Sequence, residues 1–251
     1  MEKKFRIVIL AAGKGKRMKS DVPKALTMVG GKPILQHIIE NVRASGLDTK
    51  PVIVIGSEGQ RICDAFNGGC EYAVQKKQLG TGDALRSAKH VVEKADAVIV
   101  LYGDHPFVSA KTIQKLASRH LERKNIITMM TAIVPSFNGW YRAFAHWGRV
   151  LRGKNSHIMG IQEYKDANDD QKNIHELNPA LFCFDGKWLW ENIDNLSNKN
   201  AQEEYYLTDL VARAVEQGEK LSSISVAPEE VIGINTQEER EIAEELLAKT
   251  R

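Results

Sequence analysis

Two glycines and a group of cations near the N-terminus have the composition of a loop that binds polyphosphate. Gly13 and Gly15 lack a Cβ, so the backbone can turn tightly there and aim several N–H groups at one anion. The surrounding cations add side-chain donors: Lys14, Lys16, Arg17, Lys19 and Lys24. The apolar run from Phe5 to Leu10 predicts a buried strand that leads into this loop.

The loop does not match either of the two familiar glycine fingerprints. Met18 stands where a dinucleotide-binding fold would place its third glycine, and where a P-loop would place the glycine before Lys-Ser. This disfavours both a Rossmann dehydrogenase and a P-loop NTPase. Taken alone, a basic glycine loop also fits a solvated turn or a nucleic-acid patch, so other segments must decide its role.

A carboxylate follows a second apolar run. The residues Val98 to Leu101 lead into Tyr102, Gly103 and Asp104, which places Asp104 at the tip of a predicted buried strand. Magnesium prefers oxygen ligands and is commonly shared with substrate phosphates, so one or two protein oxygens are sufficient. Asp104 is therefore a candidate Mg²⁺ ligand, although an Asp after a strand is also typical of a turn or a helix cap.

Composition and charge narrow the class of protein. The chain has 251 residues, of which 43% are hydrophobic, enough for a substantial core in one large α/β domain. A net charge of +3 does not indicate general nucleic-acid binding and favours small anionic ligands. The three cysteines lack metal-ligand spacing, which indicates reduced thiols in a cytoplasmic protein. No signal peptide and no membrane-spanning segment are expected.

The order of apolar patterns predicts a doubly wound, mostly parallel sheet of Rossmann-like type. Buried strands are expected over Arg6–Ala11, Val52–Ile55, Val98–Leu101 and Ile126–Val134. Helices are expected between them: Leu35 to Val42 with a stop at Gly46, Thr81 to Val92, and Ser109 to Arg123 with Ser109 as the cap. Ligands of such sheets bind beyond the carboxyl ends of the strands, where the glycine loop and Asp104 both fall.

The second half of the chain is less regular. From Ser136 to Leu181 short apolar runs and aromatic residues alternate with polar stretches, which we interpret as an insertion that covers the sheet. Helical periodicity returns around Leu207 to Val215 and again around Ile242 to Leu247.

Together these segments resemble the sugar-1-phosphate nucleotidylyltransferases, in particular the uridylyltransferase half of the bacterial bifunctional N-acetylglucosamine-1-phosphate uridylyltransferase/glucosamine-1-phosphate acetyltransferases. The resemblance runs through most of the chain. It is carried by LAAGKGKRM and PKAL near the start, QLGTGDAL (78–85), LYGDHPFV (101–108), GIQEYKDA (160–167), NAQEEYYLTDL (200–210) and GINT (233–236). Each motif alone is weak, but the combination is specific.

The resemblance implies a role for each matching position. Catalysis would depend on Arg17, Lys24 and Asp104, and the metal ligands would be Asp104 and Asn235. The nucleotide would contact Leu10, Ala12, Gly13, Gly15, Lys24, Gln75, Gly80, Thr81 and Asp104, with Gln75 and the Gly80-Thr81 turn reading uracil. The sugar would face Tyr102, Gly148, Glu163 and Asn178. Ignoring the resemblance, Thr81 and Asn235 are equally typical of helix caps, and Glu163 of a solvated surface charge.

The implied reaction is Mg²⁺-dependent transfer of UMP from UTP to a sugar 1-phosphate, with N-acetylglucosamine 1-phosphate as the first substrate to consider. The alternatives are another sugar or another nucleotide such as CTP, or a nucleotide-sugar binding protein without turnover. By the resemblance, residues 1–251 form one nucleotidylyltransferase domain, with a nucleotide-binding part (1–135), a sugar-binding part (136–235) and a C-terminal helix (236–251). The expected partners are small molecules rather than nucleic acid or membrane, and the oligomeric state stays open.

Four residues, at three places in the chain, depart from the family pattern. Lys16 stands where threonine is usual, His105 where a small apolar residue is usual, and Asn178-Pro179-Ala180 where Asn-Thr-Gly is usual. Pro179 removes a backbone donor beside a proposed sugar contact, which makes sugar identity less secure than nucleotide chemistry. His105 fits either a sugar contact or a structural histidine. The chain also ends without the hexapeptide repeats of an acetyltransferase domain, so acetyl transfer is not expected.

Overall fold

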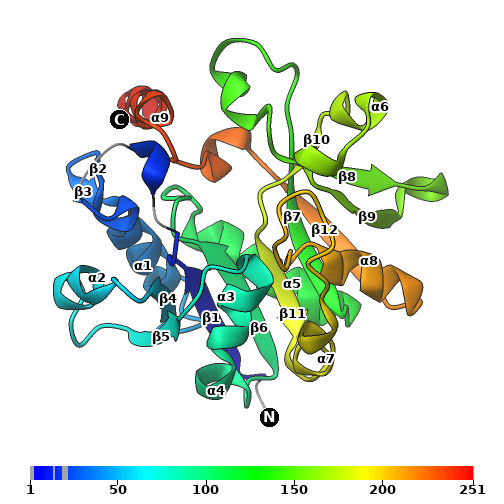
Figure 1. The fold of residues 1–251 in the computed structure, drawn as a ribbon, viewed down its shortest axis with the longest axis horizontal. Helices are drawn as coiled ribbons and strands as arrows, with labels where there is room; N and C mark the ends of the chain where they lie inside the picture. The colour runs from blue at the N-terminus through cyan, green and yellow to red at the C-terminus, as the bar shows by residue number, and fades with distance from the viewer. Residues whose placement is uncertain (1–2, 14, 19–21, 251) are drawn as a thin grey trace.

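The computed structural model describes residues 3–13, 15–18 and 22–250. Its main sheet runs in the order β5-β4-β1-β6-β11-β7-β10-β8-β9, with β12 paired to β7 outside this path (Figure 1). The strands are β1 (Phe5–Leu10), β2 (Met28–Val29), β3 (Lys32–Pro33), β4 (Val52–Gly56), β5 (Glu71–Gln75), β6 (Ala97–Tyr102), β7 (Ile127–Ile133), β8 (Gly148–Arg152), β9 (Ile158–Gln162), β10 (Glu176–Asn178), β11 (Phe182–Asp185) and β12 (Leu221–Val226). The predicted Rossmann-like α/β class is confirmed.

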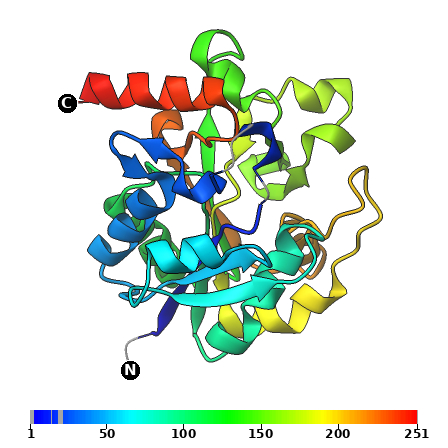
Figure 2. The ribbon, with the colours of Figure 1, turned by 60° about the vertical axis from the view of Figure 1, so that its left-hand side comes forward.

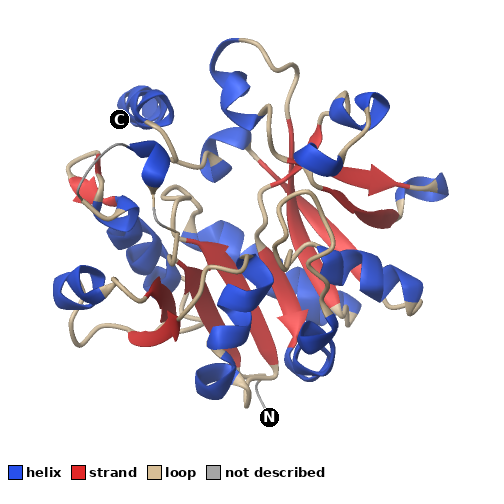
Figure 3. Cartoon of the chain, in the orientation of Figure 1, coloured by secondary structure: helices blue, strands red, loops and turns tan. Residues whose placement is uncertain are grey.

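Helices cover both faces of this sheet (Figure 3). They are α1 (Ile34–Ala44), α2 (Gln60–Ala65), α3 (Thr81–Ser87), α4 (Lys89–Val92), α5 (Ala110–Arg123), α6 (Asp169–Lys172), α7 (Gly186–Asn192), α8 (Asp209–Glu216) and α9 (Gln237–Thr250). Ser109 caps α5 as predicted, because its hydroxyl accepts a hydrogen bond from the Thr112 N–H at 3.2 Å. The helix predicted over Thr81 to Val92 is divided into α3 and α4 at Ala88.

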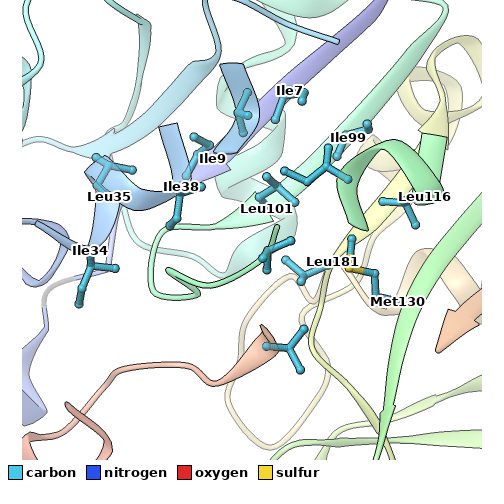
Figure 4. Packing of buried hydrophobic residues seen from close by; sticks show 14 of the residues in the cluster. Ile7, Ile9, Ile34, Leu35, Ile38, Ile99, Leu101, Leu116, Met130 and Leu181 are labelled. Atoms are coloured by element: carbon cyan, nitrogen blue, oxygen red, sulfur yellow. The ribbon is translucent and has the colours of Figure 1, made fainter. Parts of the chain in front are cut away.

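Successive side chains of the central strand β1 belong to two hydrophobic layers, one on each face of the sheet. Ile7 and Ile9 of β1 point toward α1 and α5, where they join residues such as Leu35 and Leu116 (Figure 4). The intervening Val8 and Leu10 pack on the opposite face with residues of α3, α4, α7 and α8. Because successive side chains of a strand point to opposite faces, a nearly continuous apolar strand predicts burial on both sides, as β1 shows.

The main sheet has a part in which all neighbouring strands are parallel and a part in which parallel and antiparallel pairs are mixed. Strands β5, β4, β1 and β6 are parallel neighbours. β11 joins antiparallel to both β6 and β7, and β12 then runs parallel to β7. The loops after β1 and β6 are fastened at the same edge, where the Gly103 N–H donates to the Leu10 carbonyl at 2.9 Å. The predicted meeting of the glycine loop and Asp104 is therefore confirmed.

The interpretation of residues 136–181 as an insertion covering the sheet was wrong. This segment supplies β8, β9 and β10, which extend the sheet at its far edge rather than lying over a face. These strands escaped prediction because they are short and only half apolar. Arg149 of β8 is buried, and its guanidinium donates to the carbonyls of Ala145, Trp147 and Lys172.

The C-terminal helix lies across the N-terminal part of the chain. Figure 2 shows α9 running alongside the β2–β3 hairpin, and the Gly30 N–H donates to Glu244 Oε1 of α9 at 3.0 Å. Cys63, Cys70 and Cys183 are free thiols, as expected. Within the described ranges, every helix is too short or too polar to cross a lipid bilayer.

Candidate functional site

A cavity of about 440 Å³ opens at the carboxyl ends of β1, β5 and β6. Most of the residues predicted for the nucleotide or for catalysis line it, together with Tyr102 from the predicted sugar group: Leu10, Ala12, Gly13, Arg17, Lys24, Gln75, Gly80, Thr81, Tyr102 and Asp104. Gly15 and Asn235 do not line it but lie against Lys24. The tertiary structure thus brings together residues that are far apart along the chain.

The glycine loop is anchored by Met18, the residue that breaks both fingerprints. Its side chain is buried, and its N–H donates to the Gly15 carbonyl at 2.9 Å in the short 3-10 helix η1 (Lys16–Met18). Gly15 adopts φ +60°, a conformation that favours glycine, and a Cβ there would lie 3.0 Å from Lys24 Cβ. Arg17 stays exposed at the mouth of the cavity. Lys14 and Lys19, and the side chain of Lys16, lie outside the described part of the chain.

Lys24 joins the two predicted metal ligands. Its ammonium donates to Asp104 Oδ2 at 2.7 Å and to Asn235 Oδ1 at 2.9 Å. Burial is the largest single influence and would raise the pKa of Asp104, but the Lys24 charge, the neighbouring His105 and the hydrogen bonds to the carboxylate together lower this pKa to about 2. Asp104 is therefore ionised at neutral pH inside the protein. Asn235 is not the N-cap of α9, so that alternative prediction was wrong. The Thr236 hydroxyl caps this helix instead, because it accepts a hydrogen bond from the Glu239 N–H.

The oxygens around Lys24 fit a hard divalent cation. Asp104 Oδ1 is buried and has no hydrogen-bond partner among the described residues, although a carboxylate oxygen buried in this way normally has one. The described residues contain no cluster of three His, Cys, Asp or Glu that could hold an ion by themselves. An ion here would need further oxygens from water or substrate, which is how magnesium is commonly bound.

The predicted uracil contacts lie at the start of α3. Gln75, at the end of β5, is buried, and its Nε2 donates to the Gly80 carbonyl at 3.0 Å and to Asp83 Oδ2 at 2.9 Å. These bonds fix the amide, so its Oε1 is left to accept the hydrogen bond that a pyrimidine N–H would donate. Thr81 is not the cap of α3, because Gly80 holds that position. The Thr81 hydroxyl instead accepts from the Leu207 N–H at 3.1 Å.

A second, smaller cavity of about 210 Å³ adjoins the first. Thr81, Tyr102 and Glu204 line both cavities, so the two lie side by side. The residues predicted to face a sugar all line this second cavity: Tyr102, Gly148, Glu163 and Asn178. The cavity combines two carboxylates, two amides and aromatic rings, a set able to hydrogen-bond hydroxyl groups and to pack against an apolar ring face.

Glu163 is a partly buried member of this cavity, so the reading of it as a solvated charge was wrong. Burial raises the pKa of its carboxyl, and the Thr208 hydroxyl, which donates to Oε1 at 2.8 Å, offsets part of this effect. Gly148 lies beside this carboxylate: a Cβ there would be in ordinary contact with both of its oxygens at 3.6 Å and crowded only against Ile161 Cγ2 at 3.1 Å. Burial also raises the pKa of Tyr102, which keeps its hydroxyl protonated.

The Asn178-Pro179-Ala180 departure has a visible backbone consequence. The Ala180 N–H donates to Asn178 Oδ1 at 3.0 Å, and Ala180 adopts φ +60°. Alanine in this left-handed region is strained by its Cβ, whereas the glycine usual in the resembling family is not.

Ala180→Gly is therefore expected to stabilise the protein by roughly 0.5–1 kcal/mol, because the relieved strain exceeds the added chain entropy. The free energy of unfolding in urea measures this. Ala212→Gly, inside α8, is the matched control and should destabilise by about the same amount, because glycine weakens a helix interior. Destabilisation by both substitutions would contradict the argument.

His105 is held as a buried, hydrogen-bonded histidine. Its Nδ1 lies 2.7 Å from the Val231 carbonyl, and its ring packs edge-on against Trp147 at 5.4 Å between centroids. Burial lowers the pKa of His105 despite the neighbouring Asp104 carboxylate, so the ring is neutral near pH 7. The ring also lines the second cavity, so the structure supports both readings of this residue.

Several lining residues were not singled out from the sequence. Gln78 lines the first cavity and its amide donates to the Ala12 carbonyl, and Glu204 lines both cavities. Trp147, Gln202 and Tyr206 line the second. Most of them lie within the motifs QLGTGDAL and NAQEEYYLTDL, so the signal for them was the resemblance itself.

Comparison with known proteins agrees with this arrangement. A family model described as the MobA-like NTP transferase domain matches residues 7–203. The bifunctional protein GlmU of Clostridioides difficile (strain 630) is 38% identical over 247 residues, which are 98% of this chain and 52% of that protein. GlmU of Clostridium beijerinckii is 37% identical over 242 residues, 96% of this chain and 51% of that protein. The chain thus spans about half the length of these curated relatives.

Two solved structures share the fold. UDP-glucose pyrophosphorylase in complex with UDP-glucose aligns with a TM-score of 0.76 at 15% identity, covering 100% of both chains. CMP:2-keto-3-deoxy-manno-octonic acid synthetase in complex with CTP aligns with a TM-score of 0.70 at 19% identity, covering 99% of this chain and 100% of that one. At these identities the likeness establishes the architecture alone.

Proposed function

Because this chain belongs to the MobA-like NTP transferase family, we propose that it is a nucleotidyltransferase that joins UMP from UTP to a sugar 1-phosphate, with N-acetylglucosamine 1-phosphate the first candidate. The observation that carries the proposal is the Lys24 ammonium between Asp104 and Asn235, set in the wall of the first of two adjoining cavities. The similarity to bifunctional GlmU proteins supports the choice of substrates.

The proposed reaction is a single in-line displacement. A phosphate oxygen of the sugar 1-phosphate attacks the α-phosphorus of UTP, the bond from that phosphorus to the bridging oxygen of the β-phosphate breaks, and pyrophosphate leaves. The attacking phosphate is already ionised at neutral pH, so the protein needs no nucleophile of its own. Its task is to align two anions that repel each other and to neutralise the charge that grows on the leaving group.

Each part of the site has a place in this reaction. Gln75 and the turn at Gly80 receive the base, while Lys24 and Arg17 face the phosphates from the glycine loop. Glu163 and Asn178 receive sugar hydroxyls in the second cavity. Asp104 and Asn235 would hold Mg²⁺, which when bound supplies positive charge to the phosphate oxygens. Lys24 must give up part of its contact with these two side chains for its charge to serve the substrate.

A substrate panel tests the proposal. Pyrophosphate release is measured with Mg²⁺ for UTP, CTP, GTP and dTTP, each combined with the 1-phosphates of N-acetylglucosamine, glucose and galactose. The expected result is preference for UTP with N-acetylglucosamine 1-phosphate by at least about 100-fold in kcat/KM, because unpaired buried polar groups penalise the wrong ligand.

Other outcomes of the panel revise the proposal in defined ways. If another sugar 1-phosphate is preferred, we would attribute the changed sugar specificity to Pro179, Ala180 or His105. These residues depart from the family pattern and line the second cavity. Thermal stabilisation by UTP without turnover of any pair would indicate a nucleotide-sugar binding protein and contradict the catalytic assignment.

A further inference from the structure

The residue after Asp104 is an imidazole whose orientation is fixed. His105 is 6% exposed, and its Nδ1 lies 2.7 Å from the Val231 carbonyl oxygen. A carbonyl can only accept, so Nδ1 carries the proton, and in the neutral ring Nε2 presents a lone pair. Trp147 and Tyr102 pack edge-on against the ring, with centroids at 5.4 and 6.2 Å, and prevent it from rotating freely.

The Nε2 atom lies next to the orphaned oxygen of the site. Nε2 lies 3.4 Å from Asp104 Oδ1, which is buried and makes no hydrogen bond within the described residues. The Lys24 ammonium is bound to the other oxygen, Oδ2, so it does not satisfy Oδ1. Two acceptors this close together in a buried site repel, unless a cation or a donor binds both of them.

A glycine lies next to the imidazole nitrogen. A Cβ at Gly233 would lie 3.4 Å from His105 Nε2 and 3.5 Å from Asn235 Nδ2. The backbone of Gly233 therefore lies beside both the imidazole and the amide of the second predicted metal ligand. A larger residue at this position would add atoms in van der Waals contact with both of these side chains.

We propose that His105 Nε2 is a third protein ligand of the divalent cation held by Asp104 and Asn235, and that it shifts the preference of the site from Mg²⁺ toward imidazole-binding ions such as Mn²⁺ or Co²⁺. This rests on the proposed metal site and extends it. Two ligands about 2.1 Å from one ion are roughly 3.0–3.4 Å apart at octahedral to tetrahedral angles, which the Nε2 to Oδ1 separation matches. Imidazole favours transition ions, whereas all-oxygen sets suit magnesium.

A direct ion pair between His105 and Asp104 explains the geometry less well. The 3.4 Å separation exceeds the 2.7–3.2 Å typical of an N–H···O bond, and the Lys24 ammonium nearby opposes a second positive charge. A sugar hydroxyl donating to Nε2 is the other alternative, because the ring also lines the second cavity. The experiment must separate this alternative from metal ligation.

Electron paramagnetic resonance of Mn²⁺ bound to the full chain, without nucleotide or sugar, distinguishes metal ligation by His105 from contact with a sugar hydroxyl. Pulsed measurements on the wild-type protein should show coupling to a ¹⁴N nucleus, and His105→Val should abolish it. Titration should show Mn²⁺ bound at least about 10-fold more weakly by His105→Val, with a smaller loss for Mg²⁺ measured by competition. His90→Ala, an exposed histidine on α4, is the matched control and should change neither result.

Two further variants keep the test decisive. Gly233→Ala adds a methyl group beside Nε2 without removing a polar atom, so it should weaken Mn²⁺ binding even if His105→Val fails to fold. Asp104→Asn should abolish the signal altogether. If it does not, the metal site of the proposed function is itself wrong.

The inference about His105 has its own failure outcomes. Absence of ¹⁴N coupling in the wild-type protein overturns it. Unchanged Mn²⁺ affinity in His105→Val with a raised KM for the sugar phosphate also overturns it, and assigns the ring to the sugar cavity instead.

Discussion

Lys24→Met is expected to lower kcat/KM by about 100-fold or more, the cost typical of removing a group that stabilises charge during phosphoryl or acyl transfer. The substitution keeps most of the side-chain volume and deletes the ammonium that contacts Asp104 Oδ2 at 2.7 Å and Asn235 Oδ1 at 2.9 Å. It also leaves the Asp104 carboxylate buried without its cation. A loss of stability on the order of 3 kcal/mol should accompany the loss of activity, because unpaired buried charge is costly.

The two effects can be separated. The double variant Lys24→Met/Asp104→Asn removes both charges, so it should recover part of the free energy of unfolding in urea but none of the activity. Lys32→Met is the matched control, because Lys32 pairs with Glu40 on the surface, where both side chains are nearly half exposed. Near-normal kcat/KM for Lys24→Met would remove this residue from the mechanism.

Gly80→Ala should damage both the fold and nucleotide binding. Gly80 has φ +110° and ψ 176°, a region that only glycine occupies readily, and a Cβ there would lie 2.6 Å from the Tyr205 carbonyl oxygen. The clash involves backbone, so α3 and the 204–205 segment must separate. Both line or border the first cavity, and the Gly82 N–H donates to that same Tyr205 carbonyl at 2.8 Å.

The expected loss for Gly80→Ala is roughly 2–4 kcal/mol of unfolding free energy, together with at least a 10-fold weaker UTP affinity by calorimetry. Gly46→Ala is the matched control, because Gly46 has φ +73° but a Cβ there would have open space around it to 4 Å. It should cost only about 1–2 kcal/mol of backbone strain and leave UTP affinity unchanged. Equal effects of the two substitutions would show that crowding against Tyr205 does not matter.

The nucleotide half of the site follows from local sequence. A continuous apolar strand must be buried on both faces, so Phe5–Leu10 and Ala97–Tyr102 are recognisable as central parallel strands. The loops after such strands meet at one edge of the sheet, which predicts that the glycine loop and Asp104 are neighbours. Their placement in one cavity, with Gln75 and Gly80, agrees with that expectation.

The sugar half could not be placed by the same reasoning. Strands β8, β9 and β10 are short edge elements whose pairing partners lie far away in sequence, so periodicity alone does not identify them. The sequence around Glu163 is equally typical of a surface charge, and only the tertiary structure places its carboxylate against the Thr208 hydroxyl. Gly148, Glu163 and Asn178 were chosen only through resemblance to a family, and the cavity that joins them depends on how three distant segments pack.

The sequence by itself determined the chemistry available to this protein: a cationic glycine loop, one carboxylate after a buried strand, and the α/β order that brings them to one edge. These depend on residue type and on the periodicity of neighbouring positions, which act locally. Only the tertiary structure decided that Lys24 lies between Asp104 and Asn235, that Thr81 and Tyr102 line both cavities, and that His105 Nε2 lies 3.4 Å from Asp104 Oδ1. Such contacts join residues far apart in sequence, and the packing of the whole sheet sets their distances.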